Sequence, residues 1–420
     1  MRLRTLLRTS SAVALLPFLL LHVVLLLGDG MAASVVAGYG PSVVGPASYA
    51  LAPAAAACSA AGAWEAARLR RGRVLDQAPV RSPLAVALGV LLPVWGMGLV
   101  GLAAALIVTS RAAGALPAPA HAGMVGAYAA VLAAASLLGY LLGRVLPGLA
   151  AAPVAMVVGF CAVACPGSFD PPWPRYLVAQ AYESCCDPGQ VIDPAAVWAP
   201  FVLAGGLCVA AGLVVHPFFK AARVLAVAAA AAAAAVAVWL VHDLDYNPLL
   251  ARDPSDLVCD TEARPTVCLW PETPDRGGVV RLVRSHTARL AEAGVPVTDT
   301  LSAAPREEQA AFGRNGVVRG TDMGYRLASA LMPPVPDCAR TTRQYPAVRD
   351  RSTLQVWLTA KATGVLPDAV SDRSTAEDVD IVRQVLAQPR AVQLAWYEQY
   401  RQALSGCTGR PNREIPGAAR

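Results

Sequence analysis

The first 240 residues contain a series of long apolar stretches, and this series constrains the fold more than any other feature of the chain. A helix needs about 20 mostly apolar residues to cross the hydrocarbon core of a bilayer. Seven stretches come near this length. The second is weak because Ala, Pro and Ser give it a low hydropathy, and the fifth is short. The sequence therefore predicts seven membrane-spanning helices, at residues 11–28, 43–63, 84–108, 122–143, 149–164, 197–215 and 224–241.

The chain divides into an apolar part and a polar part. Of its 420 residues, 55% are hydrophobic and 15% are charged, whereas about 25% of residues are charged in soluble domains. We therefore predict a transmembrane domain at 1–241 and a water-exposed domain at 242–420. The net charge of +6 does not indicate a nucleic-acid partner, because many cationic residues flank apolar stretches and no basic patch with interleaved aromatic residues accompanies them. The predicted partner of the first domain is the lipid bilayer.

Charged residues between the apolar stretches predict the orientation. The first stretch resembles a signal peptide, but its long apolar core and the spans that follow favour an uncleaved anchor. If the N-terminus is cytoplasmic, the short outside segments carry only Arg111 and Arg175. The inside segments then carry an excess of cationic residues, as the positive-inside rule requires: Arg2, Arg4, Arg8, Arg68, Arg70, Arg71, Arg73, Arg81, Arg144, Lys220 and Arg223.

The weak second span is supported by this charge distribution rather than by hydropathy. Without it, the arginine cluster at 68–81 would lie outside, which the positive-inside rule disfavours. Seven spans put residues 242–420 on the extracytoplasmic side. The low Lys content and the abundance of Ala, Arg, Gly and Val are typical of a GC-rich bacterial genome, so the predicted location is a bacterial cytoplasmic membrane.

The predicted extracytoplasmic domain is a small, mostly helical α+β domain. Apolar periodicity predicts one short strand, at 295–301. The same periodicity predicts helices at 277–294, 324–332, 352–363, 376–386 and 389–404. A second outside segment, the loop at 165–198, is predicted to contain a short helix at 174–183.

Cysteines cluster in the segments that are predicted to lie outside, where the environment is oxidising. Cys259 and Cys268 are separated by eight residues, a spacing that fits neither a CxxC redox motif nor a zinc site. We therefore predict Cys259–Cys268 and Cys338–Cys407 disulfides, the first of which would stabilise the domain by about 2–3 kcal/mol. A disulfide that closes the loop at 165–198 is favoured over free thiols, and its pairing is left open among Cys161, Cys165, Cys185 and Cys186.

The sequence contains little that could support catalysis. It has no HExxH, GxSxG or Walker A motif, and His286 is the only histidine after position 242. His22 is the only ionisable side chain inside the seven stretches, which argues against a proton-coupled pump. We therefore predict no enzymatic activity, no catalytic residue, no cofactor and no metal site. Any ATP hydrolysis would come from a separate partner.

A run of arginines follows the second stretch and forms a predicted cytoplasmic collar: Arg68, Arg70, Arg71 and Arg73. The simpler interpretation is a solvated, positive-inside collar that contacts anionic lipid headgroups. The functional interpretation is a docking surface for a cytoplasmic partner such as an ATPase.

Three segments carry a resemblance to a known group of proteins. They are AAAACSAAGAWEAARLRRGR after a GYG-containing loop, CDTEARPTVCLWPE just after the last span, and AWYEQYRQALSGC near the C-terminus. Together they resemble uncharacterised actinobacterial, ABC transporter permease-like integral membrane proteins with a C-terminal extracytoplasmic domain. The resemblance covers most of the chain. It implies six permease-like spans followed by an additional span that carries the outer domain, and it brings no catalytic residues. Type-2 ABC exporters usually have six spans, so the seventh is a departure from that pattern.

Two functions are therefore expected. The first is a permease-like membrane subunit of an ABC-type export system for a peptide or a lipid-like substrate, with a cytoplasmic ATPase as its partner. The alternative is a membrane-anchored extracytoplasmic protein that binds or senses a ligand and transports nothing. Assembly into a homo-oligomer is left open.

Overall fold

A computed structural model describes residues 10–28, 35–36, 38–73, 82–117, 122–180, 188–215, 221–246, 248–304, 310–312, 320–336, 347, 350–367, 374–407 and 411. The chain forms two compact units, Met1–Arg252 and Asp253–Arg420. The division lies after Arg252 because strand β2 (Leu249–Ala251) pairs antiparallel with strand β1 (Gln190–Ile192) of the first unit. The residues just after the last apolar helix therefore belong to the first unit.

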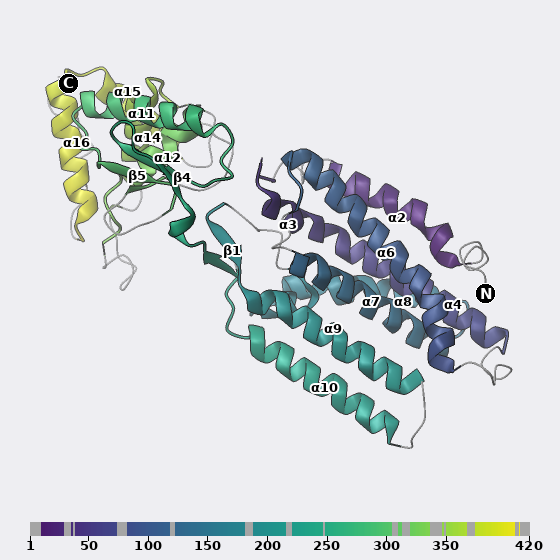
Figure 1. The fold of residues 1–420 in the computed structure, drawn as a ribbon. Coiled ribbons are helices and arrows are strands. Elements are labelled where there is room, and N and C mark those ends of the chain that lie inside the picture. The colour runs from purple at the N-terminus through teal and green to yellow at the C-terminus, as the bar shows by residue number, and fades with distance from the viewer. Residues whose placement is uncertain are drawn as a thin grey trace. The chain divides into compact units, whose positions relative to one another are not determined.

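Six helices of the first unit, counted over the described residues, are long and apolar enough to cross a membrane. They indicate an integral membrane protein and agree with six of the predicted spans to within a few residues (Figure 1). These helices are α2 (Ser11–Gly28), α6 (Pro83–Ala113), α7 (Ala122–Val145), α8 (Ala151–Ala164), which η5 (Cys165–Ser168) extends, α9 (Pro194–Val215) and α10 (Ala222–Val241).

The stretch predicted as the second span contains three short helical segments and the start of a long helix. The short segments are η2 (Gly40–Val43), α3 (Val44–Ala47) and η3 (Ser48–Ala50), and the long helix is α4 (Leu51–Arg71). Helix α4 packs against α2, α6, α7 and α8. Fifteen of its 21 residues are buried. In the apolar windows of the six other helices, by contrast, only 17–44% of the residues are buried. Its low hydropathy is thus explained by its position, because a helix enclosed by other helices needs no apolar surface for lipid.

Small residues let the helices around α4 approach closely. A Cβ atom at Gly139 of α7 would lie 2.0 Å from the carbonyl oxygen of Ser59, and one at Gly143 would lie 2.3 Å from that of Ala63. The pair α9–α10 packs in the same way, since a Cβ atom at Gly206 would lie 2.1 Å from the Cβ of Ala233. In lipid, helices associate through such packing rather than through a hydrophobic drive. The alanine tract of α10 therefore forms part of a helix interface.

One end of the bundle collects the arginines of α4, and we call it the arginine end. The start of α2 lies there, because the backbone N–H of Ser11 donates to Glu65 Oε1 at 2.8 Å. The end of α7 lies there as well, because Arg70 donates to the carbonyl oxygen of Arg144 at 2.9 Å. The long helices alternate in direction between this end and the opposite end (Figure 1).

At the opposite end, the predicted helix at 174–183 is wrong in type over its described part, and residues 181–183 lie outside the described residues. Residues Trp173–Val178 form a 3₁₀ helix, η6, which ends at Ala179 with a positive φ of 58°. Pro172 and Pro174 flank its start, and Pro174 supplies no N–H for a regular α-helical turn. The Tyr176 hydroxyl donates to the carbonyl oxygen of Asp245, so η6 is anchored to the segment that follows α10.

The second unit contains a four-stranded sheet in the order β3 (Val258–Asp260), β4 (Thr266–Leu269), β5 (Thr300–Ser302) and β6 (Ala310–Ala311). Strands β3 and β4 are antiparallel, whereas β4–β5 and β5–β6 are parallel. Strand β5 overlaps the end of the predicted strand, while β3 and β4 were not predicted. The short 3₁₀ helix η8 (Pro254–Asp256) precedes β3.

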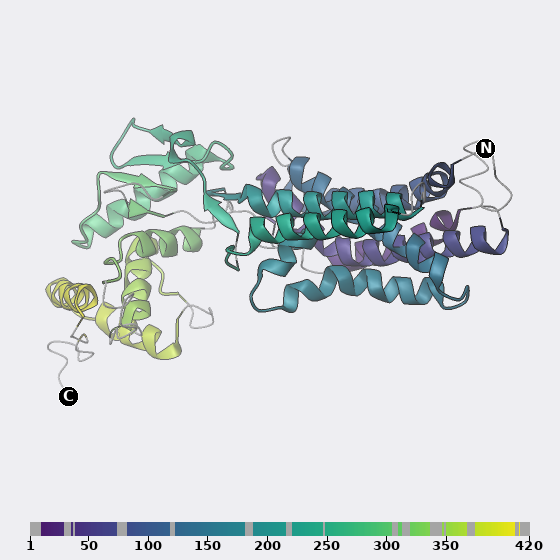
Figure 2. The ribbon, with the colours of Figure 1, turned by 90° about the horizontal axis from the view of Figure 1, so that it is seen from below.

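Five helices complete the described part of the second unit (Figure 2). The predicted positions of all five are confirmed with small shifts at their ends: α11 (Arg276–Glu292), α12 (Gly320–Ala330), α14 (Asp350–Thr363), α15 (Ala376–Leu386) and α16 (Arg390–Ser405). Helix α11 connects β4 to its parallel neighbour β5, as a crossover connection requires. The second unit is thus a small α/β region, and the first is an apolar helical bundle.

The helical part of the second unit has an aromatic core. Trp357 of α14 stacks on Tyr397 of α16 with ring centroids 5.3 Å apart, and Trp396 lies 4.1 Å from Tyr400. All four side chains are almost fully buried. Large buried aromatic rings contribute strongly to a core in water, so this cluster holds α14 and α16 together.

Candidate functional site

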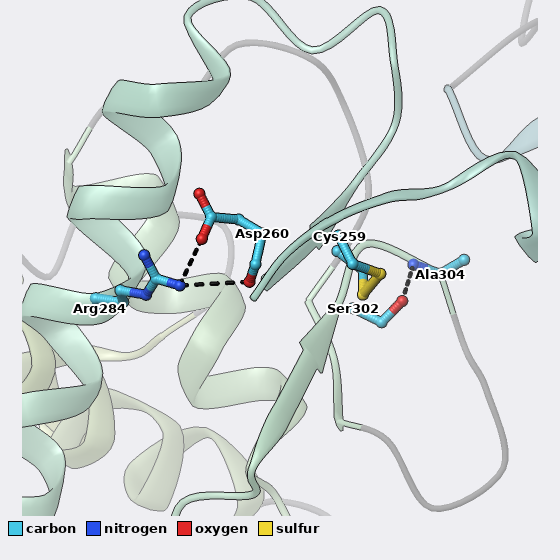
Figure 3. The surroundings of a disulfide bond; sticks show 6 residues. Cys259, Asp260, Arg284, Ser302 and Ala304 are labelled. Carbon is cyan, nitrogen blue, oxygen red and sulfur yellow. Dashed lines mark hydrogen bonds and ion pairs between the residues drawn. A yellow bond between two sulfur atoms is a disulfide. The ribbon is translucent and has the colours of Figure 1, made fainter. Parts of the chain in front are cut away.

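The predicted Cys259–Cys268 disulfide is present in the second unit. The two cysteines lie directly opposite each other on β3 and β4, with their Cα atoms 3.9 Å apart. The bond links the edge strand β3 to its neighbour, next to Ser302 of β5 (Figure 3). We call β3, β4 and their connecting turn the stapled hairpin.

A polar hollow lies between the stapled hairpin and the first turns of α11. Its volume is about 400 Å³, and β3, β4 and α11 all contribute to its lining. Its polar side comprises Cys259, Asp260, Thr261, Glu262, Arg276 and Gly277. Acidic and basic side chains therefore face the same space.

Arg284 of α11 holds the hairpin turn against the helix. Its guanidinium donates to Asp260 Oδ1 at 2.8 Å, to the carbonyl oxygen of Ala263 at 2.6 Å and to that of Pro265 at 3.3 Å (Figure 3 shows the contacts with Asp260). The hydrogen bond from Arg284 is the main cause that lowers the pKa of the Asp260 carboxyl below its usual range. Asp260 is thus a fixed carboxylate that already has a partner.

Two other charged residues, Glu262 and Arg276, line the hollow. Within the described residues, the side chains of Glu262 and Arg276 form no ion pair, and both residues are exposed. One lies on the hairpin turn and the other in the first turn of α11. The hollow therefore offers one free negative and one free positive group to a ligand.

The start of α11 is shaped by its own sequence. Asp275 has a φ of 45°, and its carboxylate accepts a hydrogen bond from the N–H of Gly278 at 3.1 Å. A Cβ atom at Gly278 would lie 2.0 Å from Asp275 Oδ2. The glycine is therefore needed for this helix cap, and the capped N–H is not open to a ligand.

No group of three or more His, Cys, Asp or Glu residues in the described chain is placed to hold a metal ion. His286 is buried on α11 and does not line the hollow. The charged side chains that line the hollow can bind a ligand through ion pairs and hydrogen bonds.

Two arginines of the collar predicted at the end of the second span form contacts within the helical bundle. Arg68 lies 2.7 Å from Glu65 Oε2, and Arg70 donates to the carbonyl oxygens of Arg144 and Leu146 at 2.9 and 2.5 Å. Cationic groups at a helix C-terminus satisfy its free carbonyl groups and its dipole. These contacts favour the structural interpretation for Arg68 and Arg70.

The rest of the collar is exposed. Arg71 lies over the ring of Trp64 with its guanidinium carbon 5.6 Å from the ring centroid, and Trp64 is 47% exposed. Arg73 follows the end of α4 with a φ of 49°. Arg71 and Arg73, together with the neighbouring Trp64, are thus the exposed residues of this region that a partner could contact.

Sequence reasoning missed the role of Glu65. It is 1% exposed, and besides Arg68 it accepts hydrogen bonds from the backbone N–H of Ser11 at 2.8 Å and from the Ser11 hydroxyl at 3.0 Å. Glu65 lies beyond the predicted end of the span, so the sequence groups it with the solvated collar. The available signal is the Glu65–Arg68 spacing of three residues in a helix.

Only some cysteines of the remaining predicted disulfides lie among the described residues. Cys407 is disulfide-bonded, and its predicted partner Cys338 lies outside the described residues, as do Cys185 and Cys186. Cys161 and Cys165 are free thiols, so the predicted loop disulfide is wrong for these two. They lie one helical turn apart, on α8 and at the start of η5, and contact each other through a hydrogen bond.

Comparisons with known proteins give a match for one part of the chain. Residues 267–407 match the model of a family described as a domain of unknown function, DUF7224. The match runs from β4 through α16, so it includes most of the second unit but not β3. No curated protein and no solved structure matches the chain.

Proposed function

We propose that the chain crosses a bacterial cytoplasmic membrane seven times, through the six apolar helices and α4, with Asp253–Arg420 on the extracytoplasmic side. Three observations support this topology. Helix α4 lies inside the bundle, the described arginines concentrate at one end of it, and the second unit contains disulfides, which persist in oxidising compartments.

Alkaline phosphatase fusions test this topology, because the enzyme is active only outside the cytoplasm. A fusion after Arg252 is expected to be active and a fusion after Ser82 inactive. The opposite pattern, or activity at both sites, would remove α4 from the set of spans.

On this topology, we propose that the chain is a membrane-anchored extracytoplasmic protein that binds or senses a small zwitterionic ligand. The polar hollow carries the proposal, because Glu262 and Arg276, which form no ion pair with any described residue, present opposite charges to one space of about 400 Å³. A ligand with an ammonium and a carboxylate group, such as the end groups of a short peptide, complements them. The proposal assigns no catalytic activity to the chain.

A thermal-shift assay on the full-length protein in detergent tests the ligand class with a set of unblocked dipeptides. The midpoint is expected to rise with these dipeptides and not with their N-acetylated or C-amidated forms. Glu262→Gln and Arg276→Gln should each abolish the shift, while Arg401→Gln on the exposed face of α16 should keep it. No shift with any dipeptide, or an equal shift with the blocked forms, would contradict the proposal.

We propose a permease-like subunit of an ABC-type export system as the second candidate function. The exposed Trp64 with Arg71 above it favours this candidate, because Trp and Arg are the residues that most often dominate protein interfaces. ATP hydrolysis would come from a separate cytoplasmic partner.

Purification from native membranes tests this candidate. A nucleotide-binding protein should copurify with ATPase activity, and Trp64→Ala with Arg71→Ala should abolish the association. Light scattering of the same sample reports whether the chain forms a homo-oligomer. A preparation that contains no nucleotide-binding protein would refute this candidate, and only the ligand-binding proposal would remain.

A further inference from the structure

Helices α8 and α9 stand on either side of α7 without packing extensively against each other. Helix α8 packs on α4 and α7, whereas α9 packs on α7 and α10 (Figure 2). All residues of these helices lie within the described part of the chain. The surface of α7 between them is therefore not covered by another long helix.

An apolar hollow of about 160 Å³ occupies this place. Its floor includes Ala134 and Leu138 of α7, and its walls include Ala162 of α8 and Leu207 of α9. All of its lining residues are apolar. Small alanine side chains in the lining leave the space open, and Leu207 is 42% exposed at its margin. We call this space the lateral groove.

The lateral groove is closed at one end by the 3₁₀ helix η6. This helix packs against α8, η5 and α9. Its Leu177 and Val178 line the end of the groove. The groove is thus closed toward the end of the bundle opposite to the arginines and open at its side.

We propose that the lateral groove binds one hydrocarbon chain of a membrane lipid. A polar ligand would lose its hydrogen bonds in this lining without replacement, and a cavity of about 150 Å³ with an apolar lining stays dry and accepts an apolar guest. Hydrocarbon chains are the medium that surrounds these apolar helices, so the guest enters sideways between α8 and α9. The bound chain ends beneath η6.

This inference rests on the membrane insertion of the six apolar helices and not on the zwitterionic ligand or the ATPase proposed above. Its failure therefore leaves those proposals standing, and their failure leaves the groove unaffected.

Photo-crosslinking in lipid nanodiscs tests the proposal. The probe is a phosphatidylethanolamine with a diazirine near the end of one acyl chain, and labelled peptides of the full-length protein are mapped by mass spectrometry. Labelling is expected to be stronger on the groove residues of α7, α8 and α9 than on the lipid-exposed face of α10. Uniform labelling of all lipid-facing helices would overturn the proposal.

Variants that fill the groove provide a second test of the proposal. Ala134→Leu and Ala162→Leu should lower groove labelling by about tenfold, which corresponds to about 1.4 kcal/mol of lost affinity. The matched control is Ala231→Leu, at an exposed alanine of α10 outside the groove, and it should change nothing. The thermal midpoint of each variant in detergent shows whether it is folded. Folded variants that keep wild-type labelling would also overturn the proposal.

Discussion

The two units of this chain are held together by different means. In the first unit, glycines and alanines bring helix backbones into direct contact around α4, and the main described ion pair lies at the end of that helix. In the second unit, large aromatic rings fill a core, and a disulfide and the Arg284–Asp260 pair secure the sheet edge. The difference follows from the solvent. Burial of apolar surface stabilises a fold in water, whereas helices in lipid associate through close packing and hydrogen bonds between helices.

The largest expected effect is in the aromatic core. Trp357→Ala should lower the free energy of unfolding of the second unit by about 3–5 kcal/mol, because it removes a fully buried ring that contacts Trp396 and Tyr397. Urea denaturation followed by circular dichroism measures it. Trp198→Ala, at a 60% exposed tryptophan of α9, is the control. Equal losses for both would show that ring burial is not what separates the two units.

The disulfide is expected to come next. Cys259→Ser combined with Cys268→Ser should destabilise the second unit by about 2–3 kcal/mol, because the crosslink restricts the unfolded chain. Cys208→Ser, at a free thiol of α9, should have little effect. Denaturation of the variant and of the wild type without reducing agent measures the difference, because reduction would also break the disulfide of Cys407. A double variant that is as stable as the wild type would indicate that the Arg284 contacts alone secure the hairpin.

The close helix contacts of the first unit should give a slightly smaller effect. Gly139→Ala should cost about 1–3 kcal/mol, because the new Cβ would lie 2.0 Å from a backbone oxygen that side-chain movement cannot relieve. Gly205→Ala is the matched control, since no atom lies within 4 Å of its Cβ position. Thermal unfolding in detergent measures both. Similar midpoints for the two variants would refute backbone contact as the basis of the bundle.

The smallest effect concerns pH. Asp378 is buried, and burial raises the pKa of its carboxyl, but hydrogen bonds from Thr353, Thr375 and Ser352 outweigh this and lower the pKa below its usual range. A lowered folded-state pKa adds stability above the unfolded value of about 3.9. That stability is lost as the pH falls through the folded value.

Asp378→Asn should therefore lower stability at neutral pH by about 1–2 kcal/mol, since a buried, hydrogen-bonded acceptor is weakened. The difference from wild type should shrink below about pH 4. Denaturant titrations between neutral and acidic pH measure it, and Asp380→Asn, in an exposed pair on the same helix, is the control. A difference that stays constant with pH would show that the carboxylate charge is not involved.

Much of the architecture could be predicted from residue patterns. Length and hydropathy located the six apolar helices, because any lipid-facing helix must be apolar along its length. Charge indicated α4 where hydropathy was weak, and cysteine spacing predicted the Cys259–Cys268 bond. The five described helices of the second unit followed from their amphipathic periodicity, which local sequence encodes.

The candidate sites were harder to predict because their residues meet only after folding. Ser11 and Glu65 are far apart in the chain, and only the packing of α2 on α4 brings them together. The polar hollow combines the turn of the stapled hairpin with the start of α11, and the lateral groove combines three helices with η6. No single segment carries the signal of either space.

The sequence by itself thus determined which segments are apolar, which end of each carries arginine, and which cysteines could pair across a short turn. Tertiary structure decided that α4 is enclosed rather than exposed to lipid, that Arg70 serves the end of α7, and that Cys161 and Cys165 stay free. The physical reason is the range of the interactions. Hydropathy and charge act on each segment separately, whereas enclosure, capping between helices and cavities depend on which neighbours the chain brings into contact.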